Sequence, residues 1–290
     1  MPSQPILRFA PSPNGYLHLG HAYSALFTWH AAETLGGTAL LRIEDIDLGR
    51  CKPEFDVAIR EDLSWLGLSW PNPVMRQSER FAVYQEAAEK LKQMKLLYPC
   101  FCSRAQYAGK ASGRDPDGAP LYPGTCRHLS AARINERLTA GEPVSWRLDM
   151  ERALTEIGTK DRLAMDEIPV GDHELLLAER ETREADPSRW GDVVLVRKDT
   201  PTSYHLSVVV DDAAQGVTHV TRGMDLFAAT DIHVLLQRLL GLPSPVYAHH
   251  RLITDAHDIK LAKSSGSPPL RLLREAGWPP ADVRRQLGFD

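Results

Sequence analysis

The chain begins with a strand, a connector and a helix, and the connector restricts the fold most. Pro11–His21 is rich in proline and glycine, which allow the chain to turn tightly. The apolar run Ile6–Ala10 before it predicts a strand, and Ala22–Leu35 after it predicts a helix. The first amides of a helix attract anions, and the connector brings His18 and His21 to that place. This order of elements predicts a phosphate-binding site.

A second strand is expected to end beside this connector. The apolar run Thr38–Asp47 reads as a buried strand that carries Glu44, Asp45 and Asp47 at its carboxyl end. Open α/β sheets bind ligands beyond the carboxyl ends of their strands. We therefore expect these acidic residues in the same crevice as the two histidines, with Asp45 and Asp47 either orienting loops or meeting Mg²⁺.

Strands and helices continue to alternate along the chain, which predicts an α/β fold with a parallel sheet. The expected helices are Glu54–Leu66, a helix capped by Ser78 that runs to about Leu96, and Asp225–Leu240. The expected strands are Asp192–Lys198, Ser203–Val210, Gly216–Arg222 and Val246–Ile253. We expect the first two of these strands to pair and to return to the main sheet.

The alternation is interrupted in the middle of the chain. Glycine, proline and aspartate accumulate from Gly109 to Gly124, which indicates an irregular excursion. We therefore divide the chain into a first half of the catalytic domain at 1–97, an inserted module at 98–186, a second half at 187–253 and a tail at 254–290. The tail would hold a polar loop and short helices.

Composition limits the class of protein. No run of about 18 apolar residues and no charged-then-apolar leader is present, which predicts a cytoplasmic protein without a membrane span. The net charge is −4, so a polyanion such as nucleic acid would need a local basic face. Arg127, Arg133, Arg137 and Arg147 form the best candidate for one. The alternative is an ordinary solvated helix face.

Two further patterns could carry chemistry. A close cysteine pair with a distant third favours metal binding, although buried reduced thiols are the alternative. Three sulfurs leave a tetrahedral zinc one ligand short; near the third cysteine His128 is the usual donor by chemistry, and Tyr122 is the other candidate. Lys260 and Lys263 could place positive charge over phosphates, but such a loop alone is usually just surface. The cysteines are Cys51, Cys100, Cys102 and Cys126.

Taken together, the front and rear loops resemble a known family. His18-Leu-Gly-His21 and Lys260-Leu-Ala-Lys-Ser264 are similar to the HIGH and KMSKS signatures of class I aminoacyl-tRNA synthetases. This resemblance implies a Rossmann-like nucleotide-binding sheet. Further matches to the glutamyl-tRNA synthetase catalytic domain are Arg8–Pro13, Gly15–His21, Leu41–Asp47 and the segment from Tyr204 to Val220–Asp225.

The rear of the chain narrows the resemblance. Only Ser265–Asp290 follows the lysine loop, which leaves room for one or two short helices and not for an anticodon-binding domain. With its cysteines, the chain is similar to the stand-alone paralogues called glutamyl-queuosine tRNA(Asp) synthetases. In that family three cysteines and a tyrosine hold zinc, which implies Cys100, Cys102, Tyr122 and Cys126. A zinc ion with four protein ligands would be structural.

The resemblance also implies a reaction. Glutamate attacks the α-phosphate of ATP, with Mg²⁺, and the resulting glutamyl-adenylate passes its acyl group to the queuosine base of tRNA(Asp). The implied catalytic residues are His18, His21 and Lys263, and Gly20 and Lys260 join them in binding ATP. The implied glutamate-binding residues are Arg8, Phe9, Ala10, Pro11, Ser12, Glu44, Tyr204 and Arg222.

Some alternatives remain open at this point. The two histidines could simply cap or pack the helix, Glu44 could pair with Arg42, and Arg222 could be a surface arginine. The chain could also be a trimmed synthetase that charges tRNA(Glu), a related enzyme that activates another carboxylate, or a catalytically silent tRNA-binding paralogue. We expect a monomer with one zinc ion per chain. The sequence does not decide which arginine meets the side-chain carboxylate of glutamate.

Overall fold

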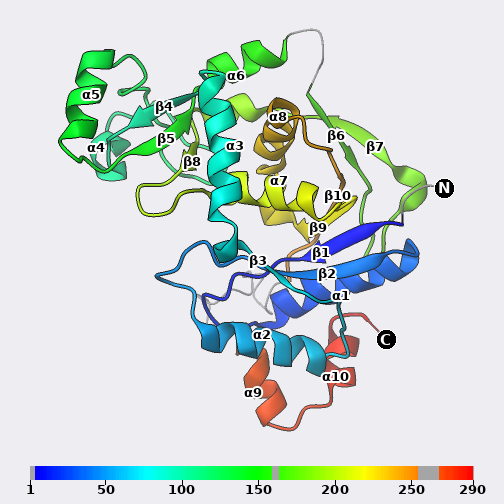
Figure 1. The fold of residues 1–290 in the computed structure, drawn as a ribbon. Coiled ribbons are helices and arrows are strands. Elements are labelled where there is room, and N and C mark those ends of the chain that lie inside the picture. The colour runs from blue at the N-terminus through cyan, green and yellow to red at the C-terminus, as the bar shows by residue number, and fades with distance from the viewer. Residues whose placement is uncertain (1–3, 159–162, 254–267, 290) are drawn as a thin grey trace.

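The protein is described here from a computed structural model, for residues 4–158, 163–253 and 268–289 (Figure 1). Its α-helices within these ranges are α1 (Leu19–Thr34), α2 (Pro53–Trp65), α3 (Phe81–Gln93), α4 (Arg104–Ala108), α5 (Ala131–Thr139), α6 (Met150–Ile157), α7 (Tyr204–Ala214), α8 (Thr230–Leu240), α9 (Leu270–Glu275) and α10 (Pro280–Gln286). Its strands there are β1 (Ile6–Phe9), β2 (Thr38–Ile43), β3 (Met75–Arg76), β4 (Leu97–Cys100), β5 (Ser145–Leu148), β6 (Ala164–Glu167), β7 (Glu181–Glu184), β8 (Val194–Val196), β9 (His219–Gly223) and β10 (Val246–His250).

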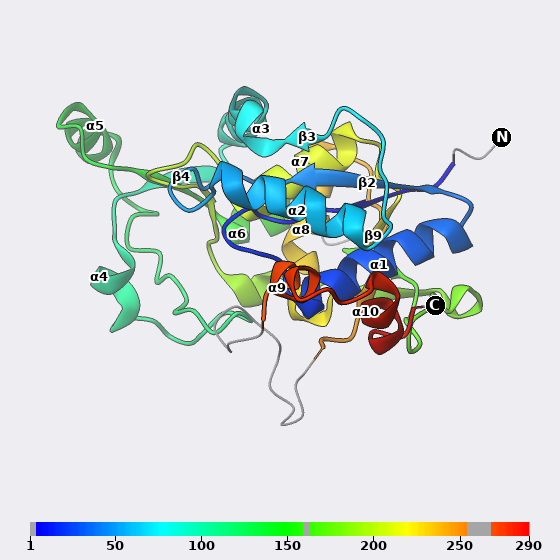
Figure 2. The same ribbon diagram turned by 90° about the horizontal axis from the view of Figure 1, so that it is seen from below.

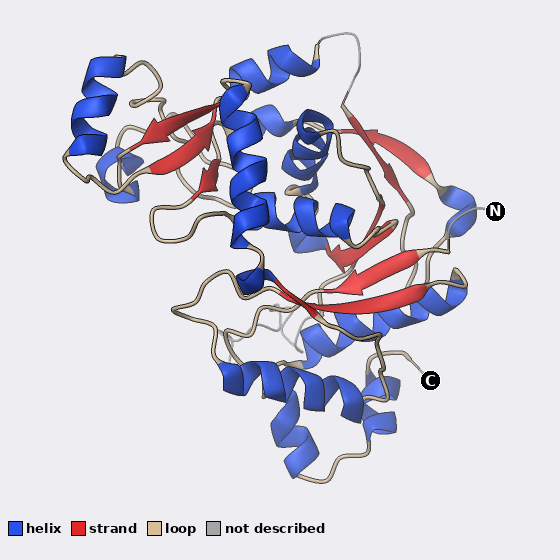
Figure 3. Ribbon diagram, viewed as in Figure 1, coloured by secondary structure: helices blue, strands red, loops and turns tan. Residues whose placement is uncertain are grey.

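A largely parallel sheet forms the centre of the molecule (Figure 3). Strands β1, β2 and β3 pair in parallel, and so do β9, β10 and β6, with β7 added antiparallel at the edge. β1 and β9 join these two groups, because the Thr218 amide donates to the Ile6 carbonyl at 2.9 Å. The expected parallel α/β sheet is thus confirmed.

The order in which the chain adds strands to this sheet reverses at β1. From β1 it crosses through α1 to β2 on one side, whereas β9 and β10 arrive on the other side. Ligands of open parallel sheets bind where the strand order reverses, beyond the carboxyl ends of the strands. The residues that follow β1, β2, β9 and β10 therefore surround one place.

Helix α1 begins at Leu19, three residues earlier than expected. His18 has extended backbone angles and acts as the N-cap, so the helix starts directly after it. Several α1 residues are fully buried, including Tyr23 and Phe27, which lie in the main hydrophobic core with β1 and β2. The glycine and proline connector is shorter than predicted because a histidine supplies the cap.

A small antiparallel sheet stands apart at one end of the molecule, next to α4 and α5 (Figure 1). Its strand order is β4, β5, β8. The prediction that the strand within Asp192–Lys198 returns to the main sheet is therefore wrong, since β8 pairs with β5. Within the expected insertion, β6 pairs instead with β10 of the central sheet. The limits of the insertion stay a prediction.

The strand predicted over Ser203–Val210 is also wrong, because this segment lies in helix α7. Val208, Val209 and Val210 are β-branched and favour a strand by propensity. In the structure all residues from Leu206 to Asp212 are buried, since α7 packs against both α3 and α8. An apolar run of this length does not distinguish a buried helix from a buried strand.

The predicted cap at Ser78 is wrong as well. Ser78 lies in a 3-10 turn before α3, which begins only at Phe81. Both its amide and its hydroxyl donate to the Asp45 carboxylate, each at 2.8 Å. The serine therefore ties this turn to the end of β2, and the Asp45 side chain orients a loop.

The C-terminal helices α9 and α10 lie below α1 and α2 in the view of Figure 1 and in front of them in Figure 2, and α9 packs against α2. Leu270, Val283, Leu287 and Phe289 are buried in the same core as α1. One or two short helices were expected after the lysine loop, and two are present in this part of the tail. In the described ranges, no helix has both the length and the apolar character needed to cross a membrane.

One buried carboxylate at this junction lacks hydrogen-bond partners. Asp62 on α2 is fully buried, and within the described ranges neither of its oxygens accepts a hydrogen bond. The Arg274 guanidinium stands 3.6 Å away and pairs with Glu61 at 2.8 Å instead. Burial raises the pKa of Asp62 to about 6.

Replacing Asp62 by asparagine is expected to stabilise the protein at pH 7 by about 1–2 kcal/mol, because the variant buries no charge. The folded pKa lies above the unfolded value of about 3.9, so the wild type loses stability as the pH rises from about 4 to 6. Denaturant unfolding at pH 4 and pH 7 measures the difference. A gain of equal size at both pH values would contradict this account; Glu61→Gln is the control, with a change within about 0.5 kcal/mol.

Candidate functional site

A cavity of about 700 Å³ lies at the carboxyl edge of the central sheet. Its walls come from the connectors that follow β1, β2, β9 and β10, together with the start of α1 and α7. All the described residues that we predicted to bind ATP or glutamate line it, namely Arg8–Ser12, His18, Gly20, His21, Glu44, Tyr204 and Arg222. Lys260 and Lys263 lie outside the described residues.

His18 and His21 form the N-terminal cap of α1. His18 Nδ1 accepts a hydrogen bond from the Gly20 amide at 3.1 Å, and His21 Nδ1 accepts one from the His18 amide at 3.2 Å. Each neutral ring therefore carries its proton on Nε2, which makes that nitrogen a donor. Capping and ligand binding were competing interpretations of these histidines. The structure shows the capping role, and the cap fixes the orientation of both imidazole rings in the cavity wall.

Arg8 and Glu44 belong to a buried cluster of four charges. Asp212 Oδ1 accepts from Arg8 Nε at 2.9 Å and from Arg42 Nη1 at 2.7 Å, and Arg42 Nη2 donates to Glu44 at 3.0 Å. Two guanidiniums thus face two carboxylates. Burial raises the pKa of Glu44 although Arg42 and Arg8 oppose the shift. A cationic group arriving beside Glu44 would favour its charged form.

Arg222 is buried in a different environment. Its Nε donates to His249 Nε2 at 3.2 Å, its Nη1 donates to His233 Nδ1 at 3.0 Å, and its Nη2 donates to the Thr230 hydroxyl. Among the described residues, no carboxylate lies within 4 Å of this guanidinium. Arg222 is therefore not the surface arginine that sequence reasoning allowed.

Tyr204 closes the cavity from the first turn of α7. Its ring stands at 5.4 Å from the His233 ring, measured between centroids. Burial raises the pKa of its hydroxyl, which therefore stays protonated at neutral pH. Tyr204 offers a flat wall and a hydrogen-bond donor on the same side as Arg222.

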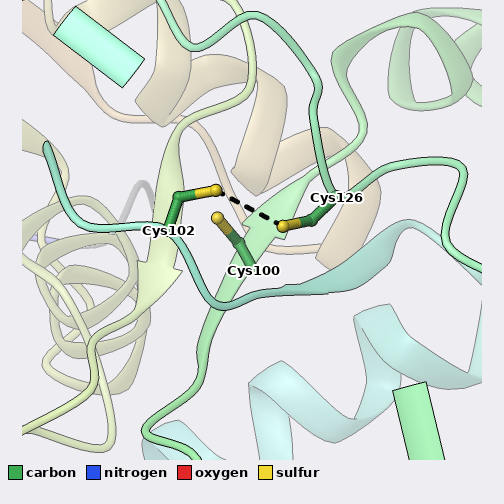
Figure 4. A group of neighbouring side chains, drawn as sticks. All are labelled: Cys100, Cys102 and Cys126. Atoms are coloured by element: carbon green, nitrogen blue, oxygen red, sulfur yellow. Dashed lines mark hydrogen bonds between the residues drawn. The ribbon is translucent and has the colours of Figure 1, made fainter. Parts of the chain in front are cut away.

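Three cysteines gather in the small antiparallel sheet and the loops beside it (Figure 4). The Sγ atoms of Cys100, Cys102 and Cys126 all lie within 4.8 Å of one another. The Tyr122 hydroxyl oxygen stands 3.6 Å from Cys102 Sγ and accepts a hydrogen bond from the Cys126 amide at 2.9 Å. Cys51 is not part of this group.

The spacing of these donors suits a tetrahedral metal. With metal–sulfur bonds of about 2.3 Å, sulfur atoms of a tetrahedral site stand about 3.8 Å apart. Cys102 Sγ and Cys126 Sγ are 3.6 Å apart, and both cysteines pack in a small hydrophobic cluster with Tyr107 and Tyr122. Three thiols and one phenol oxygen thus converge, so the residues fit a metal.

The arginines proposed as a basic face are mostly paired. Arg127 donates to Asp192 at 2.5 Å, Arg137 pairs with Glu142 at 2.5 Å, and Arg133 pairs with Glu136 at 2.6 Å. Arg147 is buried, with its guanidinium carbon 3.9 Å from the centre of the Tyr122 ring. This pattern favours the alternative of ordinary structural and surface arginines.

The family of the chain follows from comparison with known proteins. The family model described as tRNA synthetases class I (E and Q), catalytic domain, matches residues 6–288. The chain belongs to this family. It is therefore a ligase of the class I aminoacyl-tRNA synthetases, and the expectation drawn from its motifs is confirmed.

Relatives of this synthetase fall in two groups. It is 48% identical to a glutamyl-Q tRNA(Asp) synthetase of Rhodobacter capsulatus, over 98% of its own length and 100% of that protein. It is 36% identical to a glutamate–tRNA ligase of Aquifex aeolicus, where 94% of the chain spans 54% of the relative. A glutamate tRNA ligase of Elizabethkingia meningosepticum, solved with its amino acid, shares the fold with a TM-score of 0.73 and 24% identity, over 98% of this chain and 60% of that one.

Several residues of the cavity wall escaped sequence reasoning. Ser24, Asp225, His250 and Arg251 line the cavity, and His250 Nε2 stands 3.1 Å from the Ser24 hydroxyl. Asp225 lies two residues after β9, His250 ends β10 and Arg251 directly follows β10. The rule that placed Glu44 after β2 would have found them if it had been applied to β9 and β10 as well.

Gly223 illustrates why the wall has this shape. A Cβ atom at this position would stand 2.4 Å from Asp225 Oδ1 and 3.0 Å from a Leu252 methyl carbon. Only glycine allows the Asp225 carboxylate to come this close to the end of β9. The glycine that follows Arg222 therefore shapes the cavity wall beside that arginine.

Proposed function

We propose that this synthetase activates L-glutamate with ATP and transfers the glutamyl group to the queuosine base of tRNA(Asp). The charge distribution of the cavity carries the proposal. One wall offers histidine donors at a helix N-terminus, which suits phosphates, and the other offers a buried guanidinium with no carboxylate beside it. ATP and an acidic amino acid match these two walls.

On the ATP side, an α-carboxylate oxygen of glutamate attacks the α-phosphorus, and the bond to pyrophosphate breaks as the new oxygen–phosphorus bond forms. Catalysis of such a step is mainly positioning and neutralisation of charge. His18 and His21 would donate to phosphate oxygens, and Gly20 would let the phosphates approach the start of α1. Lys260 and Lys263 would supply positive charge as pyrophosphate leaves. Mg²⁺ is expected with ATP.

On the amino acid side, each charged group of glutamate would have a side chain of opposite charge beside it. Arg222 would receive one glutamate carboxylate, since its buried charge lacks an anionic partner. Glu44 would receive the α-ammonium group, and Arg8 beside it would face the other carboxylate. The backbone from Phe9 to Ser12 and the Tyr204 side chain would enclose the ligand.

In the second step a hydroxyl oxygen of the queuosine ring attacks the acyl carbon of glutamyl-adenylate, and AMP leaves. The similarity to the glutamyl-Q tRNA(Asp) synthetase of R. capsulatus over that protein's whole length supports this acceptor. We propose that the reaction takes place in the cytoplasm by a monomeric enzyme. The four cysteines of the chain are unpaired, as is usual in that compartment.

Zinc would be held by Cys100, Cys102, Tyr122 and Cys126. Four protein ligands leave no open position, so the ion would stabilise the module around it and take no part in the chemistry. The distinct strand group of this module, seen in Figure 1, supports a separate structural role.

Replacing Cys126 by alanine is expected to abolish stoichiometric zinc binding and to loosen the module around β4 and β5. Glutamate activation should fall by less than about tenfold, since this module unfolds locally while the central sheet persists. Metal analysis and ATP–pyrophosphate exchange measure the two effects. If Cys100→Ala or Cys126→Ala removed exchange as completely as Lys263→Ala, zinc would not be merely structural.

ATP–pyrophosphate exchange driven by L-glutamate, with and without tRNA, tests the first step. Transfer of labelled glutamate to tRNA(Asp) that carries or lacks queuosine tests the second. We expect exchange without tRNA and transfer only to the queuosine-containing tRNA. Exchange that requires tRNA(Glu) would instead identify a trimmed glutamyl-tRNA synthetase, and no exchange at all would identify a tRNA-binding paralogue.

A further inference from the structure

A chain of buried polar side chains leads away from Arg222. His233 Nε2 lies 3.2 Å from His205 Nδ1, and His249 Nδ1 lies 2.8 Å from Glu167 Oε1. His233 and His249 are almost completely buried. Both histidines also contact Arg222 directly, so the guanidinium stands between two imidazoles.

The guanidinium fixes the proton positions of its neighbours. Arginine only donates hydrogen bonds, so His233 Nδ1 and His249 Nε2 must both be unprotonated acceptors. His233 then carries its proton on Nε2 and His249 carries its proton on Nδ1. Both imidazoles are neutral, and burial lowers the pKa of His249 to about 4.

Arg222 lines the cavity and has N–H groups to spare. A guanidinium has five N–H donors. Three are used by His249, His233 and Thr230, and within the described part of the chain no acceptor is recorded for the other two. Two N–H groups suffice for a bidentate carboxylate.

We propose that His233 and His249 are positioning residues that hold the Arg222 guanidinium without neutralising it. The neutral acceptors orient the planar guanidinium, while its full positive charge stays available for a carboxylate of the substrate. One acidic residue, Glu167, is linked to Arg222 through His249 and is itself 2.7 Å from Arg183 Nε. The inference rests on the proposed binding of glutamate by Arg222.

This arrangement also bears on specificity. A carboxylate placed directly on Arg222 would satisfy its charge permanently and remove the advantage of an anionic ligand. An acidic amino acid is favoured over its amide only while the guanidinium is uncompensated. The neutral histidines would therefore maintain the preference for glutamate over glutamine.

The test compares His233→Glu with His233→Gln, which have the same shape and differ in charge. His233→Glu is expected to raise the KM for L-glutamate by at least about 30-fold, because the new carboxylate pairs with Arg222 and repels the substrate. His233→Gln keeps a neutral acceptor for Nη1 and should raise it only a few-fold. The kcat and the KM for ATP should change much less in both variants, and unliganded His233→Glu should melt no lower than the wild type.

Gln237→Glu is the matched control, because it places a carboxylate one turn further along α8, where Gln237 contacts Tyr247 and Ser244. It should leave the KM for glutamate unchanged. Equal KM values for His233→Glu and His233→Gln, or a fall in kcat without a rise in KM, would overturn the positioning role. If the wild type shows no exchange, the proposed reaction fails, and calorimetry with L-glutamate then tests the inference by itself. Glutamate binding that is lost only in His233→Glu would support the positioning role. Absence of glutamate binding in all variants, including the wild type, would refute it.

Discussion

Replacing Arg222 by glutamine is expected to lower kcat/KM for L-glutamate by roughly 1000-fold, which corresponds to about 4 kcal/mol of lost transition-state binding. Glutamine is neutral and offers two N–H donors that cannot span both histidines and a carboxylate. The substrate carboxylate would then be buried against neutral neighbours, which is costly. Most of the loss should appear in the KM for glutamate, while the KM for ATP changes little.

Arg222→Lys separates charge from geometry. Lysine keeps the positive charge but not the planar fork, so we expect an intermediate loss of roughly 10- to 100-fold. Arg180→Gln changes an exposed arginine that pairs with Asp166 on the surface, and it serves as the control. Glutamate-driven exchange in Arg222→Gln within about tenfold of the wild type would contradict the assignment of this residue.

Replacing Asp212 by asparagine is expected to destabilise the protein by about 3–5 kcal/mol. Asp212 is almost completely buried and accepts hydrogen bonds from both Arg8 and Arg42. Without its charge, two buried guanidiniums would face Glu44 alone. Denaturant unfolding measures the loss.

The same variant should alter the response to acid. Burial alone would raise the pKa of Asp212, but Arg8 and Arg42 outweigh it and hold the pKa below its usual value. The folded pKa is thus lower than the unfolded one, so the stabilisation is present above about pH 4 and is lost as the pH falls below that value. Asp212→Asn should therefore show a shallower loss of stability in acid than the wild type.

Asp231→Asn is the comparison variant, because it removes a buried carboxylate that pairs with a single arginine and not with two. Asp231 is also buried, but it pairs with Arg189, which is half exposed, at 2.7 Å. We expect a loss of about 1 kcal/mol, because solvent can replace the partner. An equal loss in Asp212→Asn and Asp231→Asn would show that the four-charge cluster contributes nothing special.

The strand-end rule and the family resemblance together were most informative about the site. Glu44 was expected in the crevice because parallel strands end at a common edge, and the resemblance implied Arg8 and Arg222; all three line the cavity. Histidines next to a helix start were likewise placed correctly. What the sequence did not reveal is which partners hold them. Asp212 lies on a helix that was predicted as a strand, so its contact with Arg8 could not be anticipated.

Errors arose where tertiary contacts override local preference. The valines of α7 favour a strand in isolation, yet the helix is enclosed by α3 and α8. Ser78 is a good capping residue by type, but the carboxylate of Asp45 competes for its donors. Neither competitor is close in sequence. Local pattern alone therefore could not identify them.

The contact between β1 and β9 has a consequence for how the protein folds. The Ile6 amide donates to the Thr218 hydroxyl across 212 residues of sequence. Closing so long a loop costs conformational entropy before the neighbouring contacts form, so this junction is expected to assemble slowly. Because residues from both sides of this seam line the cavity, neither side folded alone would contain the complete site. Activity on refolding should therefore return with the last, slowest phase.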